Sequence, residues 1–172
     1  MQQTLVWIGL GSNLGERITF LQRALDMLQQ DNRLQLINTS SIYETEPLGF
    51  ESDQPFLNAV ATIIWTGNAE ELLKLIATTE TSLGRTRNDE IRYESRCIDL
   101  DILFFGEEVI NNSTLQVPHP RIHERQFVLQ PLNELIPSYI HPVLNQSVSE
   151  LVHFCKDKSK VFIHAKPLSV NH

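Results

Sequence analysis

The stretch Ile98–Phe104, which reads IDLDILF, is the segment that decides how this chain folds. Its apolar side chains recur at every second position, which is the period of a strand with one face against a core. Asp99 and Asp101 fall on the opposite face together with Leu103. We therefore predict a half-buried strand whose two carboxylates point from the same side, with Cα atoms about 7 Å apart.

The segments before this strand alternate between strand and helix patterns. β-Branched and aromatic residues favour strands, and apolar residues at intervals of three and four favour helices. In chain order we expect strand, helix, strand, strand, helix and strand, over residues 5–10, 18–28, 34–43, 56–65, 69–83 and 98–104. This order predicts an α+β fold with a ferredoxin-like βαββαβ core, in which an antiparallel sheet carries its helices on one face.

The remaining C-terminal part adds smaller elements to that core. We expect a short helix over His123–Gln130 that ends at Pro131, because proline lacks the amide hydrogen that a helix needs. Ser147 and Glu150 have the spacing of a capping box and predict the start of another helix. We expect residues 159–172 to form a peripheral tail with a short strand over 161–164, so that residues 1–172 make one domain.

The composition excludes several classes of protein. A formal net charge of -7 disfavours a general nucleic-acid binder, and no run approaches the 18 apolar residues of a membrane span. Cys97 and Cys155 lack the spacing of a zinc site or a disulfide framework. We expect a cytoplasmic protein that binds neither nucleic acid nor membrane and acts as a monomer.

The acidic pair of the last strand is the first candidate site. Two like charges beside apolar neighbours disfavour each other, and a divalent cation neutralises such a pair. The alternative is an exposed edge strand with two surface acids. Six of the nine arginines lie between residues 85 and 125, where there is no lysine. Guanidinium groups suit phosphate oxygens, so the combination favours a metal–nucleotide site over a solvated charged loop.

Two other patterns have simpler explanations. The glycines of Gly9–Gly15 do not have the spacing of a dinucleotide or phosphate loop, and we interpret them as a tight turn from strand to helix. His119 and His123 are four residues apart, but Pro118 and Pro120 disfavour a helix that would let both bind one zinc ion. His119 alone can still donate a hydrogen bond to a phosphate.

Several motifs together resemble one known family. Arg96–Leu103 is similar to the signature R-x-x-D-aliphatic-D of the hydroxymethyldihydropterin pyrophosphokinases, and the opening turn Gly11–Gly15 also matches. Tyr43–Gly49 resembles the family's first pterin loop, and Val117–His119 its third landmark. The matches follow the family's order from about Leu5 to Leu135. Where family members commonly have Trp-Gly-Pro, this chain has Tyr-Glu-Ser at residues 93–95.

The resemblance implies roles for individual residues. Asp99 and Asp101 would hold two Mg²⁺ ions against the phosphates of ATP, the co-substrate, with Arg85 and Arg96 completing the catalytic set. The residues implied to bind ATP are Leu73, Arg85, Arg87, Arg92, Arg96, Ile102, His119 and Arg125, of which Leu73 and Ile102 would line the adenine site. The residues implied to bind the pterin are Thr45, Leu48, Phe56, Asn58 and Phe127, with the rings of Phe56 and Phe127 on its two faces.

The reaction implied by the resemblance is a diphosphate transfer from ATP to 6-hydroxymethyl-7,8-dihydropterin, which yields AMP and the pterin diphosphate for folate biosynthesis. Two alternatives stay open on the residues alone. A metal-dependent phosphohydrolase would use water in place of the pterin alcohol. A regulatory domain of the same fold would bind a small ligand without turnover.

Overall fold

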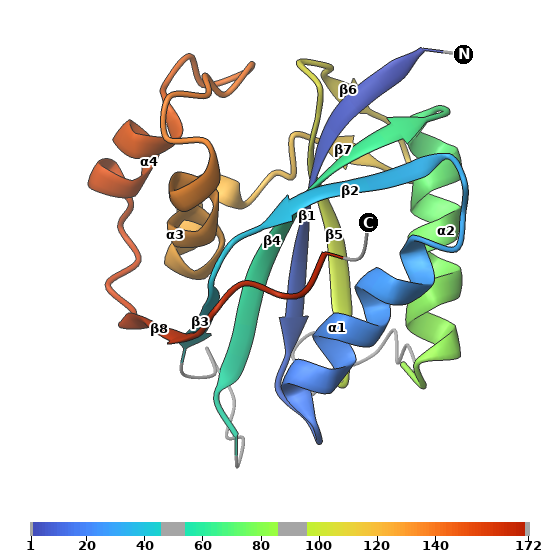
Figure 1. Cartoon of the computed structure of the whole chain (residues 1–172). Helices are drawn as coiled ribbons and strands as arrows, with labels where there is room; N and C mark the ends of the chain where they lie inside the picture. Colours follow the sequence, from blue (N-terminus) through green and yellow to red (C-terminus); the bar gives the residue numbers. More distant parts are fainter. Residues whose placement is uncertain (1, 46–53, 86–95, 171–172) are drawn as a thin grey trace.

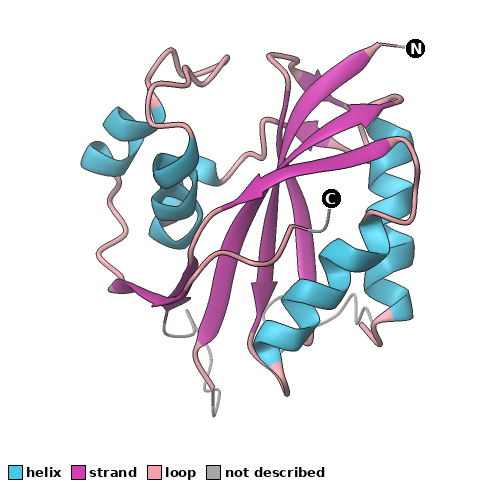
Figure 2. Cartoon of the chain, in the orientation of Figure 1, coloured by secondary structure: helices cyan, strands magenta, loops and turns pink. Residues whose placement is uncertain are grey.

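The computed structural model describes residues 2–45, 54–85 and 96–170. Its main feature is a six-stranded antiparallel sheet in the order β5-β1-β4-β3-β8, with β2 paired to β4 beside β3 (Figures 1 and 2). The strands of this sheet are β1 (Gln3–Ser12), β2 (Leu34–Thr39), β3 (Ile42–Thr45), β4 (Phe56–Thr66), β5 (Asp99–Phe105) and β8 (Val161–Ala165). A separate hairpin joins β6 (Ile110–Asn111) to β7 (Gln116–Val117).

Helices cover both faces of the sheet, each over its own core (Figure 1). The first core contains α1 (Arg17–Leu28) and α2 (Ala69–Ser82), and the second contains α3 (Gln126–Leu135) and α4 (Val148–Phe154). A one-turn helix, η1 (Ile122–Glu124), precedes α3. The predicted mixed fold with an antiparallel sheet is present, but the C-terminal helices are a second covering layer. None of the helices in the described ranges is long and apolar enough to cross a membrane.

The segment 34–43, predicted as one strand, forms the two strands β2 and β3. Both pair with β4, β2 along its second half and β3 along its first. Ser40 lies between them: its backbone N–H donates to the Val60 carbonyl, and its hydroxyl accepts from the Val60 N–H. The prediction of one continuous strand was wrong because this side-chain bond replaces a regular ladder bond at the break.

The β5 strand confirms the alternating pattern as far as Ile102; an irregularity in its pairing with β1 then puts Phe104 in the second core, on the other face from the prediction. In its antiparallel pairing with β1, Asp99 lies opposite Gly11 and Asp101 opposite Gly9. These two glycines are therefore inside a strand, and our interpretation of them as turn residues was wrong. Only Gly15, with a φ of +66°, has the left-handed backbone that a turn there requires.

The helix signals were correct in kind and less reliable at the ends. Ser147 and Glu150 form the expected capping box of α4, and Asn68 and Glu71 form a second one at the start of α2. The prediction that Pro131 ends a helix was wrong, since α3 continues through it to Leu135. The buried side chains of Leu129 and Leu132 lie on either side of the proline in the second core, and their packing outweighs the lost backbone bond.

The segment after Lys158 contributes to the core of the fold. The short strand expected over 161–164 is present as β8, which pairs with β3 at the edge of the sheet. Leu168 beyond it is only 6% exposed and packs in the first core. The Leu168 carbonyl also accepts a hydrogen bond from the Thr39 hydroxyl. At Leu168 the expectation of a peripheral tail was therefore wrong.

We predict that Leu168→Ala lowers the free energy of unfolding by about 2–4 kcal/mol, because it removes buried methyl groups and leaves a cavity. Denaturant unfolding followed by circular dichroism measures the change. The matched substitution Leu144→Ala, at a side chain 37% exposed, should shift the midpoint far less. Equal effects of the two substitutions would contradict a structural role for the chain end.

Candidate active site

The candidate site is built around Asp99 at the start of β5. Each oxygen of its carboxylate has its own arginine: Arg85 Nη1 lies 2.7 Å from Oδ1, and Arg96 Nη1 lies 2.9 Å from Oδ2. Arg85 is just beyond the end of α2, and Arg96 is three residues before Asp99. The structure thus brings three of the four predicted catalytic residues into direct contact, although Arg85 and Asp99 are 14 positions apart in sequence.

Glu80, near the end of α2, supports this cluster and was missed by the sequence analysis. Glu80 is 1% exposed, and its carboxylate pairs with Arg85 and accepts a hydrogen bond of 2.7 Å from the backbone N–H of Leu100. Leu100 separates the two aspartates, so Glu80 fixes both the arginine and the strand that carries the acids. The sequence signal was an acid on the apolar stripe of a helix, where a buried charge needs a partner.

Asp101 is the fourth member of the predicted catalytic set, and its environment disfavours its charge. The pKa of Asp101 is raised to about 7, first by burial and then by the carboxylates of Asp99 and Glu80, against the opposing effect of Arg125 and Arg85. A cation beside the pair would relieve this repulsion. The electrostatics of Asp101 are therefore not those of a surface acid.

His119 lies beside β5, because its backbone N–H donates a hydrogen bond of 2.9 Å to the Leu103 carbonyl. It follows a cis peptide bond between Val117 and Pro118. Burial and the positive charge of Arg125 lower the pKa of His119 to about 4, so the ring is neutral at pH 7. Since Nδ1 accepts the backbone N–H of Arg121, Nε2 carries the proton and can donate to an anion.

The predicted pterin residues Asn58 and Thr45 lie in strands at the same end of the sheet. The Asn58 amide donates to the Thr45 hydroxyl at 3.0 Å, and both side chains are buried. In the strand register Asn58 pairs with Gly11, which in turn pairs with Asp99. Asn58 and Asp99 are thus two strand spacings apart, about 10 Å.

Gly11 is small for a steric reason. A Cβ atom there would come within 3.2 Å of Asn58 Oδ1 and 3.9 Å of Asp99 Cβ. Because Gly11 has no side chain, no Cβ atom comes between the predicted pterin residue Asn58 and Asp99 of the acidic pair. Asn13, just after β1, connects this region to the arginines, because it exchanges two hydrogen bonds with the backbone of Arg96, one of 3.0 Å and one of 2.6 Å.

The aromatic residues begin two elements that contact each other. Phe56 opens β4 and Phe127 lies in the first turn of α3, which packs against β3 and β4. Arg125, just before α3, places its guanidinium carbon 5.5 Å from the centre of the Phe127 ring. Arg125 thus contacts a predicted pterin residue, and its charge also acts on both Asp101 and His119.

The other predicted residues are less closely associated with the acidic pair. Leu73 is a half-buried residue of α2, and Ile102, the residue directly after Asp101, is buried in the first core. Leu48, Arg87 and Arg92 lie outside the described residues, as does Tyr93. The structure therefore neither supports nor contradicts their predicted roles.

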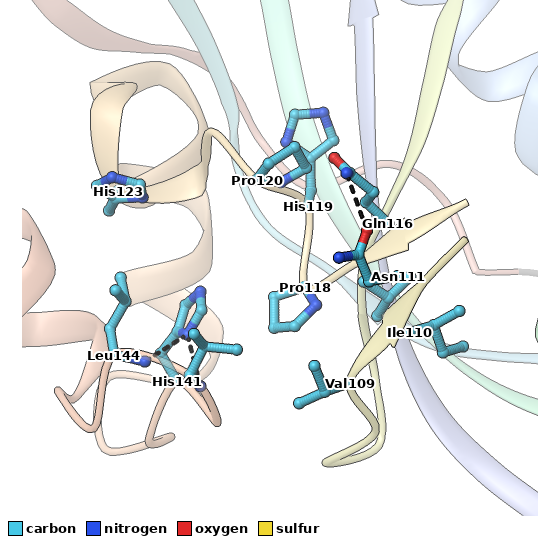
Figure 3. Close-up of a pocket in the computed structure, with 12 residues that line it drawn as sticks. Val109, Ile110, Asn111, Gln116, Pro118, His119, Pro120, His123, His141 and Leu144 are labelled. Atoms are coloured by element: carbon cyan, nitrogen blue, oxygen red, sulfur yellow. Dashed lines mark hydrogen bonds between the residues drawn. The ribbon is translucent and has the colours of Figure 1, made fainter. Parts of the chain in front are cut away.

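A separate hollow of about 320 Å³ lies beside His119 (Figure 3). Its walls come from the β6–β7 hairpin, from Pro118 and Pro120, and from the turn that contains His141 and Leu144 (Figure 3). Of the predicted site residues that the structure describes, His119 alone lines it. Neither aspartate of the acidic pair lines this hollow, so it is not their binding cleft.

Comparison with known proteins gives a consistent result. The model of the family described as 7,8-dihydro-6-hydroxymethylpterin-pyrophosphokinase (HPPK) matches residues 7–137. The chain is 42% identical over 165 residues to the 2-amino-4-hydroxy-6-hydroxymethyldihydropteridine pyrophosphokinase of Bacillus subtilis, covering 94% of this chain and 98% of that protein. The protein of the same name from Aquifex aeolicus is 37% identical, over 84% of this chain and 88% of that one.

Solved structures share the fold. The wild-type HPPK-DHPS of Plasmodium falciparum with pteroate superposes with a TM-score of 0.69 over 88% of this chain and 44% of that one, at 16% identity. At that identity the likeness speaks for the fold alone. The family match and the two bacterial relatives carry the assignment: the chain belongs to the 7,8-dihydro-6-hydroxymethylpterin-pyrophosphokinase family.

Proposed function

We propose that this chain transfers the terminal diphosphate of ATP to the hydroxymethyl group of 6-hydroxymethyl-7,8-dihydropterin, at the site between Asn58 and the acidic pair. The observation that carries the proposal is the cross-strand row of Asn58, Gly11 and Asp99, with arginines on the acid. Such a row holds a neutral heterocycle at one end and a charged phosphate chain at the other. The two substrates would meet over the glycine.

The acidic pair fits Mg²⁺ by the chemistry of its donors. Mg²⁺ prefers oxygen ligands and in phosphate-transfer sites takes one or two carboxylates, completing its shell with phosphate oxygens and water. We propose that Asp99 and Asp101 hold two Mg²⁺ ions, which would neutralise phosphate charge when bound.

The remaining charged residues would orient the phosphate chain. Arg85 and Arg96 are held on Asp99, and guanidinium groups fixed in this way are suited to donate to phosphate oxygens. Neutral His119 would donate from Nε2, as argued above from its Nδ1 bond. We propose that Arg87, Arg92 and Arg125 complete this group and that adenine lies against Leu73 and Ile102. Preorganised donors of this kind stabilise the charge that develops during transfer.

The proposed step is an in-line displacement. The hydroxymethyl oxygen of the pterin forms a bond to the β-phosphorus while the bond from that phosphorus to the bridging oxygen of the α-phosphate breaks, so AMP leaves with that oxygen. Alignment and charge neutralisation supply most of the rate in such transfers. We propose that Asp99 accepts the proton that the alcohol loses.

The pterin would be recognised by its shape and by hydrogen bonds. We propose that the rings of Phe56 and Phe127 lie on its two faces, because they begin the elements β4 and α3 that pack together. Asn58 and the backbones of Thr45 and Leu48 would pair with its polar edge. The bond from Asn58 to Thr45 supports this assignment, since it fixes the orientation of the amide.

The finer structural assignments rest on more general grounds. We propose that the sheet with α1 and α2 is a ferredoxin-like core, an assignment supported by the strand order β5-β1-β4 with β2 and β3 beyond. We propose that residues 1–172 act as one domain and as a monomer. The cytoplasm is the proposed compartment, since Cys97 and Cys155 are free thiols.

The decisive experiment is incubation with ATP, Mg²⁺ and the reduced pterin alcohol. We expect one AMP for each pterin diphosphate formed, measured by ion-exchange chromatography, because a diphosphate leaves ATP as one unit. Inorganic phosphate or diphosphate released without the pterin would instead identify a phosphohydrolase. Absence of turnover would favour the ligand-binding alternative.

We predict that Asp99→Asn and Asp101→Asn each lower the rate of transfer by a factor of about 10³ or more, because each removes a charge that holds the metal–phosphate complex. The rate of AMP formation at saturating ATP measures the loss. Both variants should keep the circular dichroism spectrum of the parent protein. Asp26→Asn on α1 is the matched control and should transfer at the parent rate; comparable activity in all three variants would refute the assignment.

We predict that Asp101→Asn also stabilises the metal-free protein above pH 7. The pKa of Asp101 is higher in the folded chain than in the unfolded one, so between about pH 4 and pH 7 the folded chain binds more protons. Stability from this group therefore falls as the pH rises through that window. Urea unfolding with EDTA at pH 5 and pH 8 should show a larger gain at pH 8, by more than about 1 kcal/mol; a gain that is equal at both pH values would contradict the raised pKa.

A further inference from the structure

The residue that begins α1 breaks a local rule. Arg17 occupies the first helical turn, where the helix dipole disfavours a positive charge, and the first turn of α1 contains no acid. The N-cap residue, Glu16, makes no side-chain capping bond. Because nothing in the helix itself explains an arginine here, its purpose must come from tertiary contacts.

Those contacts join two strands that lead into the pterin side of the site. Arg17 Nη1 donates to the Pro55 carbonyl at 2.7 Å and lies 3.4 Å from a carboxylate oxygen of Glu44. Glu44 is in β3 and Pro55 immediately precedes β4. His164 of β8 holds the same carboxylate oxygen of Glu44 at 3.2 Å. One guanidinium group thus connects α1 to β3 and to the start of β4.

Each residue held by Arg17 is the direct neighbour of a proposed pterin residue. Glu44 precedes Thr45 and Pro55 precedes Phe56, and Thr45 and Phe56 face each other in the pairing of β3 with β4. The Arg17 side chain is 18% exposed, so little water competes for these bonds. In contrast, none of these contacts involves the acidic pair or its arginines.

We propose that Arg17 is a positioning residue for the pterin: through Glu44 and Pro55 it fixes Thr45 and Phe56 in the geometry that recognises the heterocycle, without touching either substrate. This proposal rests on the function proposed above. A truncated side chain would loosen the pterin side while leaving the triphosphate side unchanged. The consequence is a selective effect on the pterin KM.

The test is steady-state kinetics of Arg17→Ala with each substrate varied in turn. We expect the KM for the pterin alcohol to rise about ten-fold, while the KM for ATP and kcat stay within about two-fold. Arg17→Lys retains a charged donor and should recover most of the pterin KM. Arg23→Ala, an exposed arginine of the same helix, is the matched control and should behave as the parent protein.

A pterin KM unchanged in Arg17→Ala would overturn the proposal, and so would equal rises in both KM values, which indicate general loss of structure. The double substitution of Arg17 and Glu44 by alanine gives a second measure. Glu44→Ala should raise the pterin KM by a smaller factor in the Arg17→Ala background than in the parent protein. Equal factors in the two backgrounds would count against the contact. If the parent protein forms no AMP, the proposed function fails instead, which separates the two outcomes.

Discussion

The repulsion between two carboxylates on one strand is the constraint on which the rest of the site depends. Asp101 is partly buried near Asp99 and Glu80, and its raised pKa reflects the electrostatic cost of that arrangement. A structure tolerates such a cluster only where opposite charges are fixed close by. Arg85 and Arg96 provide these charges to Asp99, and the backbone of β5 is itself anchored by Glu80.

This constraint explains how the fold is arranged around the site. The β5 strand is at the edge of the sheet, so its outer side is open to the segment of His119 and to the end of α2. On its inner side lies β1, in which Gly11 has no side chain that would come between Asn58 and Asp99. Acids, arginines and a neutral histidine can therefore converge on one region from four separate parts of the chain.

The two ends of the site are held by different means. The phosphate end depends on charge, through arginine–carboxylate pairs in partly buried positions. The pterin end depends on strand pairing and on neutral hydrogen bonds such as that from Asn58 to Thr45. Arg17 is the one charged residue we assign to the pterin end, and it acts there through backbone and carboxylate neighbours. We propose that these separate supports position the two substrates independently.

Local patterns were sufficient for much of this description. The alternation in Ile98–Phe104 determined the strand and put both aspartates on one face, and the capping boxes at Asn68 and Ser147 determined where two helices begin. These features depend on neighbours a few residues away, so the sequence by itself contains them. The family motifs likewise pointed to the residues that surround Asp99.

Other features were decided only by the tertiary structure. The break at Ser40, the helix that continues through Pro131 and the burial of Leu168 each depend on contacts with distant segments. Glu80 and Arg17 looked like ordinary helix residues, yet their partners lie on other elements. A local pattern records which face of an element is apolar, but a buried charge is understood only once the group that neutralises it has been brought to it by the fold.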